Sequence, residues 1–152
     1  MLSQLLCHLL RLLMSSSSTH KNSVLIDIWQ SFFALPNWVK IWVGLWLVPV
    51  NMLTLCFITQ PSGLLIACLA FAGLLPNIVV MVYNRGFSRL MALPHLLPWT
   101  ILLGVVYSTL PLSNGLYTAF LWVLLITNFI SLLFDYPDSY KWFKGQKEVA
   151  GK

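Results

Sequence analysis

The side chains that could do chemistry within the apolar parts of this sequence are few and mostly uncharged. They are three asparagines, Asn51, Asn77 and Asn128, and one histidine, His95. An amide facing lipid would leave its polar groups without partners, so we expect the asparagines to face the protein interior. Imidazole gains and loses protons near neutral pH. His95 is therefore either a hydrogen-bonded residue near the membrane surface or a ligand or proton-relay group.

Two uses of the asparagines remain open. Pro49 and Pro76 lie close to Asn51 and Asn77, and a proline within a helix frees a carbonyl that an amide can bind. Such bonds hold helices together, each contributing about 0.6–2 kcal/mol. The same groups could instead line a polar pathway or pocket, because transporters place binding sites at broken helices. The three asparagines and His95 are therefore candidate pathway residues.

The remaining reactive residues form no pattern typical of an enzyme or a metal site. The cysteines, Cys7, Cys56 and Cys68, lack the Cys-x-x-Cys spacing of disulfide enzymes. A single histidine in the apolar stretches cannot supply two axial haem ligands. A metal site would need three or four converging ligands, and the sequence does not assemble them. We therefore expect no enzyme, no metal and no cofactor.

Composition indicates an all-α integral membrane protein. The chain has 152 residues, of which 59% are hydrophobic and 9% charged, whereas a soluble domain carries about 25% charged residues. A water-soluble fold is excluded, and with it a nucleic-acid partner for the net charge of +5. Apolar stretches of about 20 residues cross the hydrocarbon core as helices. The predicted four-transmembrane-helix bundle comprises residues 38–59, 63–83, 90–112 and 115–134.

The distribution of basic residues predicts the orientation. The turns at residues 60–62 and 113–115 carry no charge, whereas Arg85 and Arg89 lie between the second and third spans. Short loops rich in Lys and Arg stay in the cytoplasm. With both termini inside, all nine basic residues are cytoplasmic. Small size and compact loops indicate a bacterial cytoplasmic (inner) membrane.

The segments that flank the spans are predicted to lie at the membrane surface. Residues 1–23 are predicted to form an amphipathic and disordered extension. Alternatively, the true start is Met14 and residues 1–13 lie upstream of it. Residues 24–35 have the pattern of a short interfacial helix ended by Pro36. Residues 135–152 form a basic, aromatic tail for anionic headgroups or, alternatively, for another subunit. The expected interfacial anchors are aromatic: Trp29, Trp38, Tyr140 and Trp142.

Charged residues near the inner surface suggest a cluster of ion pairs. Arg85 and Arg89 in the middle loop are expected on the same side of the membrane as Asp135 and Asp138 after the fourth span. Ion pairs among them would tie the loop to the tail, although each pair near water contributes little.

These features leave two functions in view. The first is an interaction or accessory component that packs against lipid, itself or a larger membrane complex. The alternative is a homo-oligomeric transporter or channel for a small neutral or hydrophobic solute. The sequence names no substrate and no partner protein.

Overall fold

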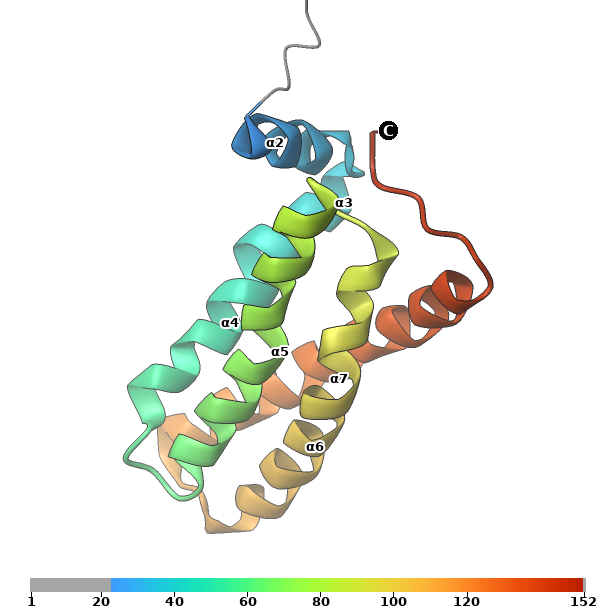
Figure 1. The fold of residues 1–152 in the computed structure, drawn as a ribbon. Helices are drawn as coiled ribbons and strands as arrows, with labels where there is room; N and C mark the ends of the chain where they lie inside the picture. Colours follow the sequence, from blue (N-terminus) through green and yellow to red (C-terminus); the bar gives the residue numbers. More distant parts are fainter. Residues whose placement is uncertain (1–22, 152) are drawn as a thin grey trace, which may run out of the picture.

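The computed structural model describes residues 23–151, which are helical and form no strand (Figure 1). Our predictions for residues 1–22 lie outside this part. Four helical stretches are long and apolar enough to cross a membrane, which confirms the predicted number. They are Asn37–Phe57, Gly63–Asn84, Arg89–Leu112 and Gly115–Phe143.

The first of these stretches changes helix type along its length. It comprises α3 (Asn37–Ile41), the π-helical η1 (Trp42–Leu47), α4 (Val48–Met52) and the 3-10 helix η2 (Leu53–Phe57). Pro49 lacks the N–H that would bind the carbonyl one turn back, so the backbone widens into a π turn just before it.

The second and third stretches follow their predicted bounds closely. The second is α5 (Gly63–Asn84), which ends where Arg85 adopts a left-handed conformation with φ of 51°. The third comprises η3 (Arg89–Ala92), α6 (Leu93–Thr109) and η4 (Leu110–Leu112).

The fourth stretch is one helix, α7 (Gly115–Phe143), which is longer than predicted. We expected the span to end at Phe134 and a basic, aromatic tail to follow. Instead, α7 continues through Pro137 as far as Phe143. Asp135 and Asp138 therefore lie on this helix and not after it.

The helices pack as a ring of antiparallel neighbours (Figure 1). Helix α5 contacts α4 and α6, while α7 contacts α6, α4 and η1. The short helix α2 (Val24–Ala34) lies across one end of this bundle, the end at which the C-terminal residues also lie. Both described ends of the chain are thus on the same side.

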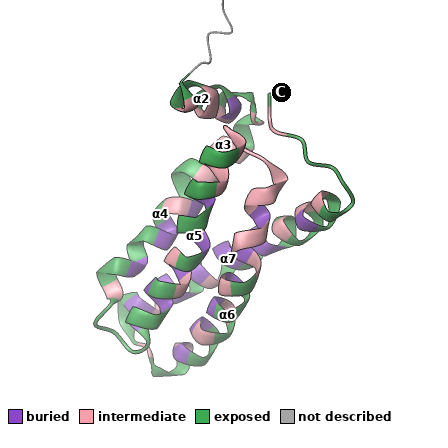
Figure 2. Ribbon diagram, in the orientation of Figure 1, coloured by how far each residue is buried: buried purple, intermediate pink, exposed green. Residues whose placement is uncertain are grey.

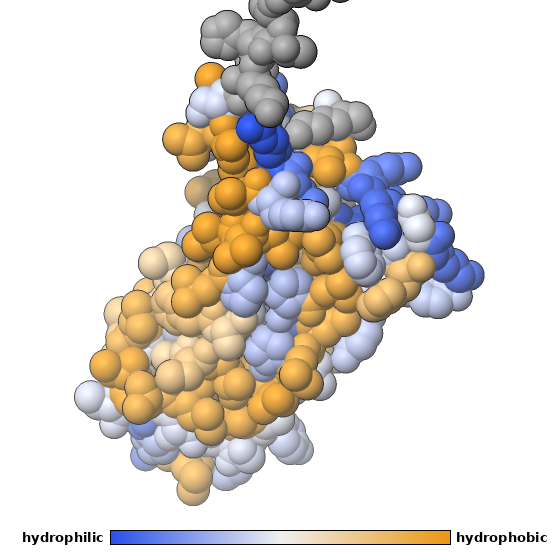
Figure 3. All heavy atoms as spheres, viewed as in Figure 1, coloured by the Kyte–Doolittle hydropathy of each residue, from blue (hydrophilic) through white to orange (hydrophobic). Residues whose placement is uncertain are grey.

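Many exposed apolar side chains and several buried polar ones distinguish this bundle from a water-soluble protein. Large apolar side chains such as Leu45, Leu64 and Leu116 are exposed over the outside of the bundle (Figure 3). Polar residues from all four stretches are buried among apolar ones. Figure 2 shows where the buried positions lie along the helices. An apolar exterior of this extent suits lipid and not water. The buried apolar core includes Leu47, Ile66, Ala70, Trp99, Leu102, Val106, Leu121 and Leu124.

Candidate functional site

His95 lies in the first turn of α6, where it is 8% exposed and stacks on Trp99. The two ring centroids are 4.1 Å apart. The Trp99 indole is fully buried and donates a hydrogen bond to the carbonyl of Ala70 (3.3 Å). Gly73 makes room for it, because a Cβ at Gly73 would lie 2.2 Å from Trp99 Nε1. A glycine on α5 thus sets the position of the histidine on α6.

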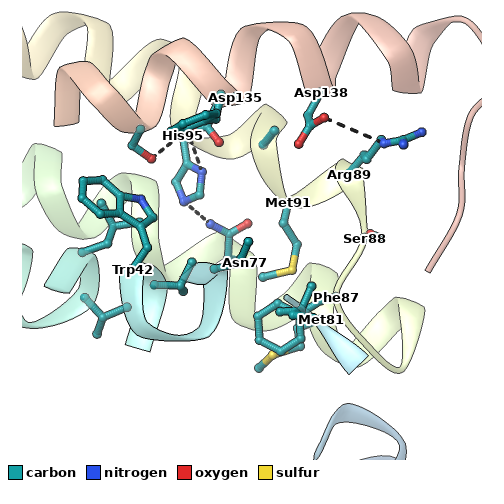
Figure 4. A pocket seen from close by; sticks show the side chains of 18 of the residues that line it. Trp42, Asn77, Met81, Phe87, Ser88, Arg89, Met91, His95, Asp135 and Asp138 are labelled. Carbon is teal, nitrogen blue, oxygen red and sulfur yellow. Dashed lines mark hydrogen bonds and ion pairs between the residues drawn. The ribbon is translucent and has the colours of Figure 1, made fainter. Parts of the chain in front are cut away.

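A line of polar side chains runs through His95 and joins three helices (Figure 4). On α5, Asn77 Nδ2 donates to the carbonyl of Gly73 (3.2 Å) and lies 2.5 Å from His95 Nε2. On α7, Asp135 Oδ2 lies 3.5 Å from His95 Nδ1 and accepts a hydrogen bond from Ser131 Oγ (3.2 Å). We call Asn77 and His95, which are buried, together with Asp135, whose side chain is 15% exposed, the buried polar chain.

The partners of Asn77 determine where the proton of His95 lies. The carbonyl of Gly73 only accepts hydrogen bonds, so the Asn77 atom facing it is the NH₂ group. The same NH₂ group faces His95 Nε2, which must therefore present a lone pair. The neutral imidazole then carries its proton on Nδ1, the atom turned toward Asp135. A histidine in this state can take up a proton at Nε2 only if the Asn77 NH₂ group gives up its hydrogen bond there.

A cavity of about 930 Å³ borders the buried polar chain. Its size falls within the range of about 300–1,000 Å³ that is typical of sites for small molecules. The walls come from the first stretch, α5, η3, α6, α7 and residues 148–151, and most of them are apolar. The apolar lining includes Trp38, Trp42, Leu74, Ile78, Met81 and Phe134. The polar lining includes Asn77, His95, Ser131 and Asp135, with the charged Arg89, Asp138 and Glu148.

Residues 145–151, which follow α7 and which we call the C-terminal tail from here on, fold back over one side of this cavity. The backbone N–H of Ala150 donates to the carbonyl of Phe87 (2.8 Å), and Val149 forms an isolated antiparallel bridge with Ser88. Because residues 148–151 line the cavity, these contacts make the tail one of its walls.

Arg89 holds this tail in place through its side chain. Its guanidinium donates to Gln146 Oε1 (2.7 Å) and pairs with Asp138 (3.8 Å) and Glu148 (3.9 Å). These groups are partly exposed, so each pair contributes little by itself. Together they join η3, α7 and the tail at one point.

The asparagines are buried as predicted, with exposures of 0% for Asn51, 7% for Asn77 and 0% for Asn128. Each donates from Nδ2 to the carbonyl four residues earlier in its own helix. Asn128 does so without a proline nearby, and none of these carbonyls is the one that Pro49 or Pro76 frees. The expectation that the amides bind the freed carbonyls is therefore wrong.

Only one of the three asparagines belongs to the cavity. Asn77 reaches His95 on the next helix and lines the cavity, whereas Asn51 and Asn128 are absent from its walls. In all three residues the oxygen Oδ1 is buried and has no hydrogen-bond partner among the described residues. The structure thus brings Asn77 and His95 together and separates them from the other two candidates.

The predicted ion-pair cluster divides into separate contacts. Arg89 pairs with Asp138 as expected. Arg85 instead pairs with Asp27 of α2 (3.2 Å), and Asp135 faces His95. Asp135 lies one turn closer to the core than Asp138, and this position turns its carboxylate inward. Sequence reasoning missed this role because we ended the span one residue before Asp135.

The predicted anchors lie mainly on the outside of the described structure. Trp29, Trp38 and Tyr140 are exposed by 59–63%, and Trp142 is partly covered, with Lys147 Nζ 5.0 Å from its ring centroid. Trp38 also packs against Phe134 (5.8 Å between centroids) and lines the cavity. An outward tryptophan at a cavity wall suits a site that borders lipid.

Comparison of the chain with models of known protein families, with curated proteins and with solved structures found no match. Within residues 23–151, no group of three His, Cys, Asp or Glu side chains is placed to hold a metal ion. The interpretation of the site therefore depends on its own geometry.

Proposed function

We propose that this chain is a small membrane carrier that binds an amphipathic or apolar molecule in the cavity beside His95. The observation that carries this proposal is one cavity of about 930 Å³ with apolar walls and a buried polar chain along one side. Sites for small molecules combine these two features, because apolar walls supply affinity and a few polar groups fix orientation.

We thus rank transport of a small solute, the alternative that the sequence left open, ahead of the accessory role that the sequence suggested first. An accessory component needs an exposed docking face, and the exposed aromatic side chains of α2 and α7 suit one. It needs neither a cavity of this size nor a histidine that contacts two other helices beside it. Both features have a direct use in a binding protein.

We further propose that the end of the bundle with α2 and the tail faces the cytoplasm, in a bacterial inner membrane. The basic residues of the middle loop and of the tail gather at this end, where cytoplasmic loops carry their Lys and Arg. The cavity includes charged residues from this same end, Arg89 and Glu148. A ligand would then exchange between the cavity and the inner leaflet.

A pair of matched substitutions tests the binding function. Val43 lines the cavity, whereas Val123 is 40% exposed on α7 and does not line it. Protein purified in detergent is equilibrated with 1-dodecanol, and bound molecules are counted by native mass spectrometry. Val43→Trp fills part of the cavity and should weaken binding by about tenfold or more, while Val123→Trp should leave it unchanged. Equal binding by the two variants would place the alcohol elsewhere and contradict the proposal.

A further inference from the structure

We infer that His95 is a proton-binding site coupled to the cavity, so that a proton and a ligand that donates a hydrogen bond to Asn77 exclude each other. This inference rests on the proposed binding function and names the chemical class of the ligand. It also makes the carrier responsive to protons. The inference depends on the hydrogen-bond and charge partners of Asn77, His95 and Asp135.

The neutral form of His95 has one position left for a proton. From α5 the uncharged Asn77 faces Nε2, from α7 Asp135 faces Nδ1, and on α6 itself Trp99 stacks on the ring. Because Nδ1 already carries the proton of the neutral ring, a second proton must bind at Nε2. The other charged groups that line the cavity are Arg89, Asp138 and Glu148.

A proton at Nε2 is incompatible with the present orientation of the Asn77 amide. The two nitrogens lie 2.5 Å apart, and both would then be donors with no acceptor between them. A half-turn of the amide about its Cβ–Cγ bond removes the conflict, because it brings Oδ1 to face the new N–H. The turn gives up the bond from Nδ2 to the Gly73 carbonyl and leaves two acceptor oxygens facing each other there. In exchange, Oδ1 accepts a charge-assisted hydrogen bond from Nε2–H of the imidazolium. The Nδ1 side of the same ring faces the Asp135 carboxylate.

The same turn changes what the cavity wall offers to a ligand. Asn77 lines the cavity, and its buried Oδ1 has no partner among the described residues. In Figure 4 this oxygen points away from His95, on the side of Met91. In that orientation it suits a ligand with a hydroxyl or amine donor. After the turn an N–H takes its place, and a donor ligand loses its acceptor.

Proton and ligand therefore compete, and linkage makes the effect reciprocal. A donor ligand favours neutral His95, and a proton on His95 disfavours the donor ligand. If one proton is involved, affinity for the donor ligand falls by at most about tenfold for each unit of pH over the range in which that proton binds. A ligand that has only acceptors should not show this fall.

Two uncharged amphiphiles of similar length test the ligand class. The probe 1-dodecanol has a hydroxyl donor, whereas dodecyl methyl ether has an acceptor only, and neither titrates. Bound molecules are counted by native mass spectrometry after equilibration between about pH 6 and about pH 8.5, the range in which imidazole titrates. Affinity for the ether should rise at low pH relative to affinity for the alcohol, because the alcohol can either donate to Oδ1 or accept from the N–H, and His95→Gln should remove the difference. Parallel pH dependence of the two probes, or a dependence that survives in His95→Gln, would overturn the inference.

Nuclear magnetic resonance tests the proton site without any ligand. The variant H8Q/H20Q keeps His95 as its one histidine, so its ¹⁵N-labelled ring gives a single set of signals. At neutral pH we expect a protonated Nδ1 and a pyridine-type Nε2. On acidification Nε2 should become protonated, and the side-chain amide signals of Asn77 should change with the same midpoint. Asn128, which makes the same local bond without a histidine, is the internal reference.

The two experiments separate the ways in which the inference can fail. If neither amphiphile binds, the cavity proposal fails together with the ligand class. The proton site then depends on the resonance experiment alone. A neutral ring protonated at Nε2, or a titration of His95 that leaves the Asn77 amide unchanged, would refute the coupled turn even if both amphiphiles bind.

Discussion

The close approach of Gly73 to Trp99 gives a prediction whose size follows from the structure. A Cβ at Gly73 would lie 2.2 Å from Nε1, 2.7 Å from Cδ1 and 2.8 Å from Cε2 of the buried indole. Gly73→Ala must therefore displace this ring, which also carries the stacked His95. The displacement also breaks the hydrogen bond from Trp99 to Ala70.

The expected loss of stability is about 3 kcal/mol. Overpacking of a core costs about 1–3 kcal/mol, and a buried N–H left without a partner costs about 1–3 kcal/mol. Replacing glycine by alanine within a helix returns about 0.5–1 kcal/mol. The control is Gly104→Ala on α6, because nothing lies within 4 Å of a Cβ at that position. Gly104→Ala should therefore raise the free energy of unfolding by about 0.5–1 kcal/mol, the gain from replacing glycine by alanine within a helix.

Unfolding of the purified protein in mixed micelles, followed by circular dichroism, measures both substitutions. A double-mutant cycle with Trp99→Phe isolates the clash, because phenylalanine lacks the pyrrole ring that holds the closest atoms. Gly73→Ala should cost at least about 1 kcal/mol less in the Trp99→Phe background. If Gly73→Ala in the otherwise native chain is as stable as Gly104→Ala, the packing argument is refuted.

Three further predictions concern the polar side chains. Asn128→Leu removes a buried oxygen that has no partner, and it should be neutral or stabilise the protein by up to about 1 kcal/mol in the same unfolding assay. Asn77→Leu also removes the hydrogen-bond partner of His95 and should cost about 1–3 kcal/mol. Asp135→Asn removes the charge that faces His95 and should destabilise the protein by about 1–3 kcal/mol. Asp138→Asn, in a partly exposed ion pair, should cost under about 1 kcal/mol. Equal costs would contradict the role of Asp135 as the partner of His95. Arg89→Gln removes the ion pairs that hold the tail and should speed hydrogen exchange of the tail amides about two- to fivefold, with α5 unaffected.

The four apolar stretches were predictable because their signal is local. Length and hydropathy within each segment decide whether it is long and apolar enough to cross a membrane, and no contact with another segment enters that decision. Burial of the three asparagines was predictable for a similar reason, since an amide in lipid is costly wherever the neighbouring helix lies.

The end of the fourth helix was not predictable in this way. The charges at Asp135 and Asp138 and the proline between them resemble the end of a span. Helix α7 continues because its last turns pack against η3 and because Arg89 of η3 pairs with Asp138. These contacts join residues far apart in the sequence, so no local pattern reports them.

Local patterns were enough to predict that this chain forms apolar helices of membrane-spanning length with buried amides. They also singled out His95 as the titratable residue within those helices. The packing of the helices makes Asn77 and Asp135 the partners of His95 and keeps Asn51 and Asn128 away from it. Packing is decisive because each asparagine can bind the carbonyl one turn back in its own helix, whatever lies beside it. The way the helices turn toward each other, here with Gly73 admitting Trp99, fixes which amide meets the histidine and where the cavity opens.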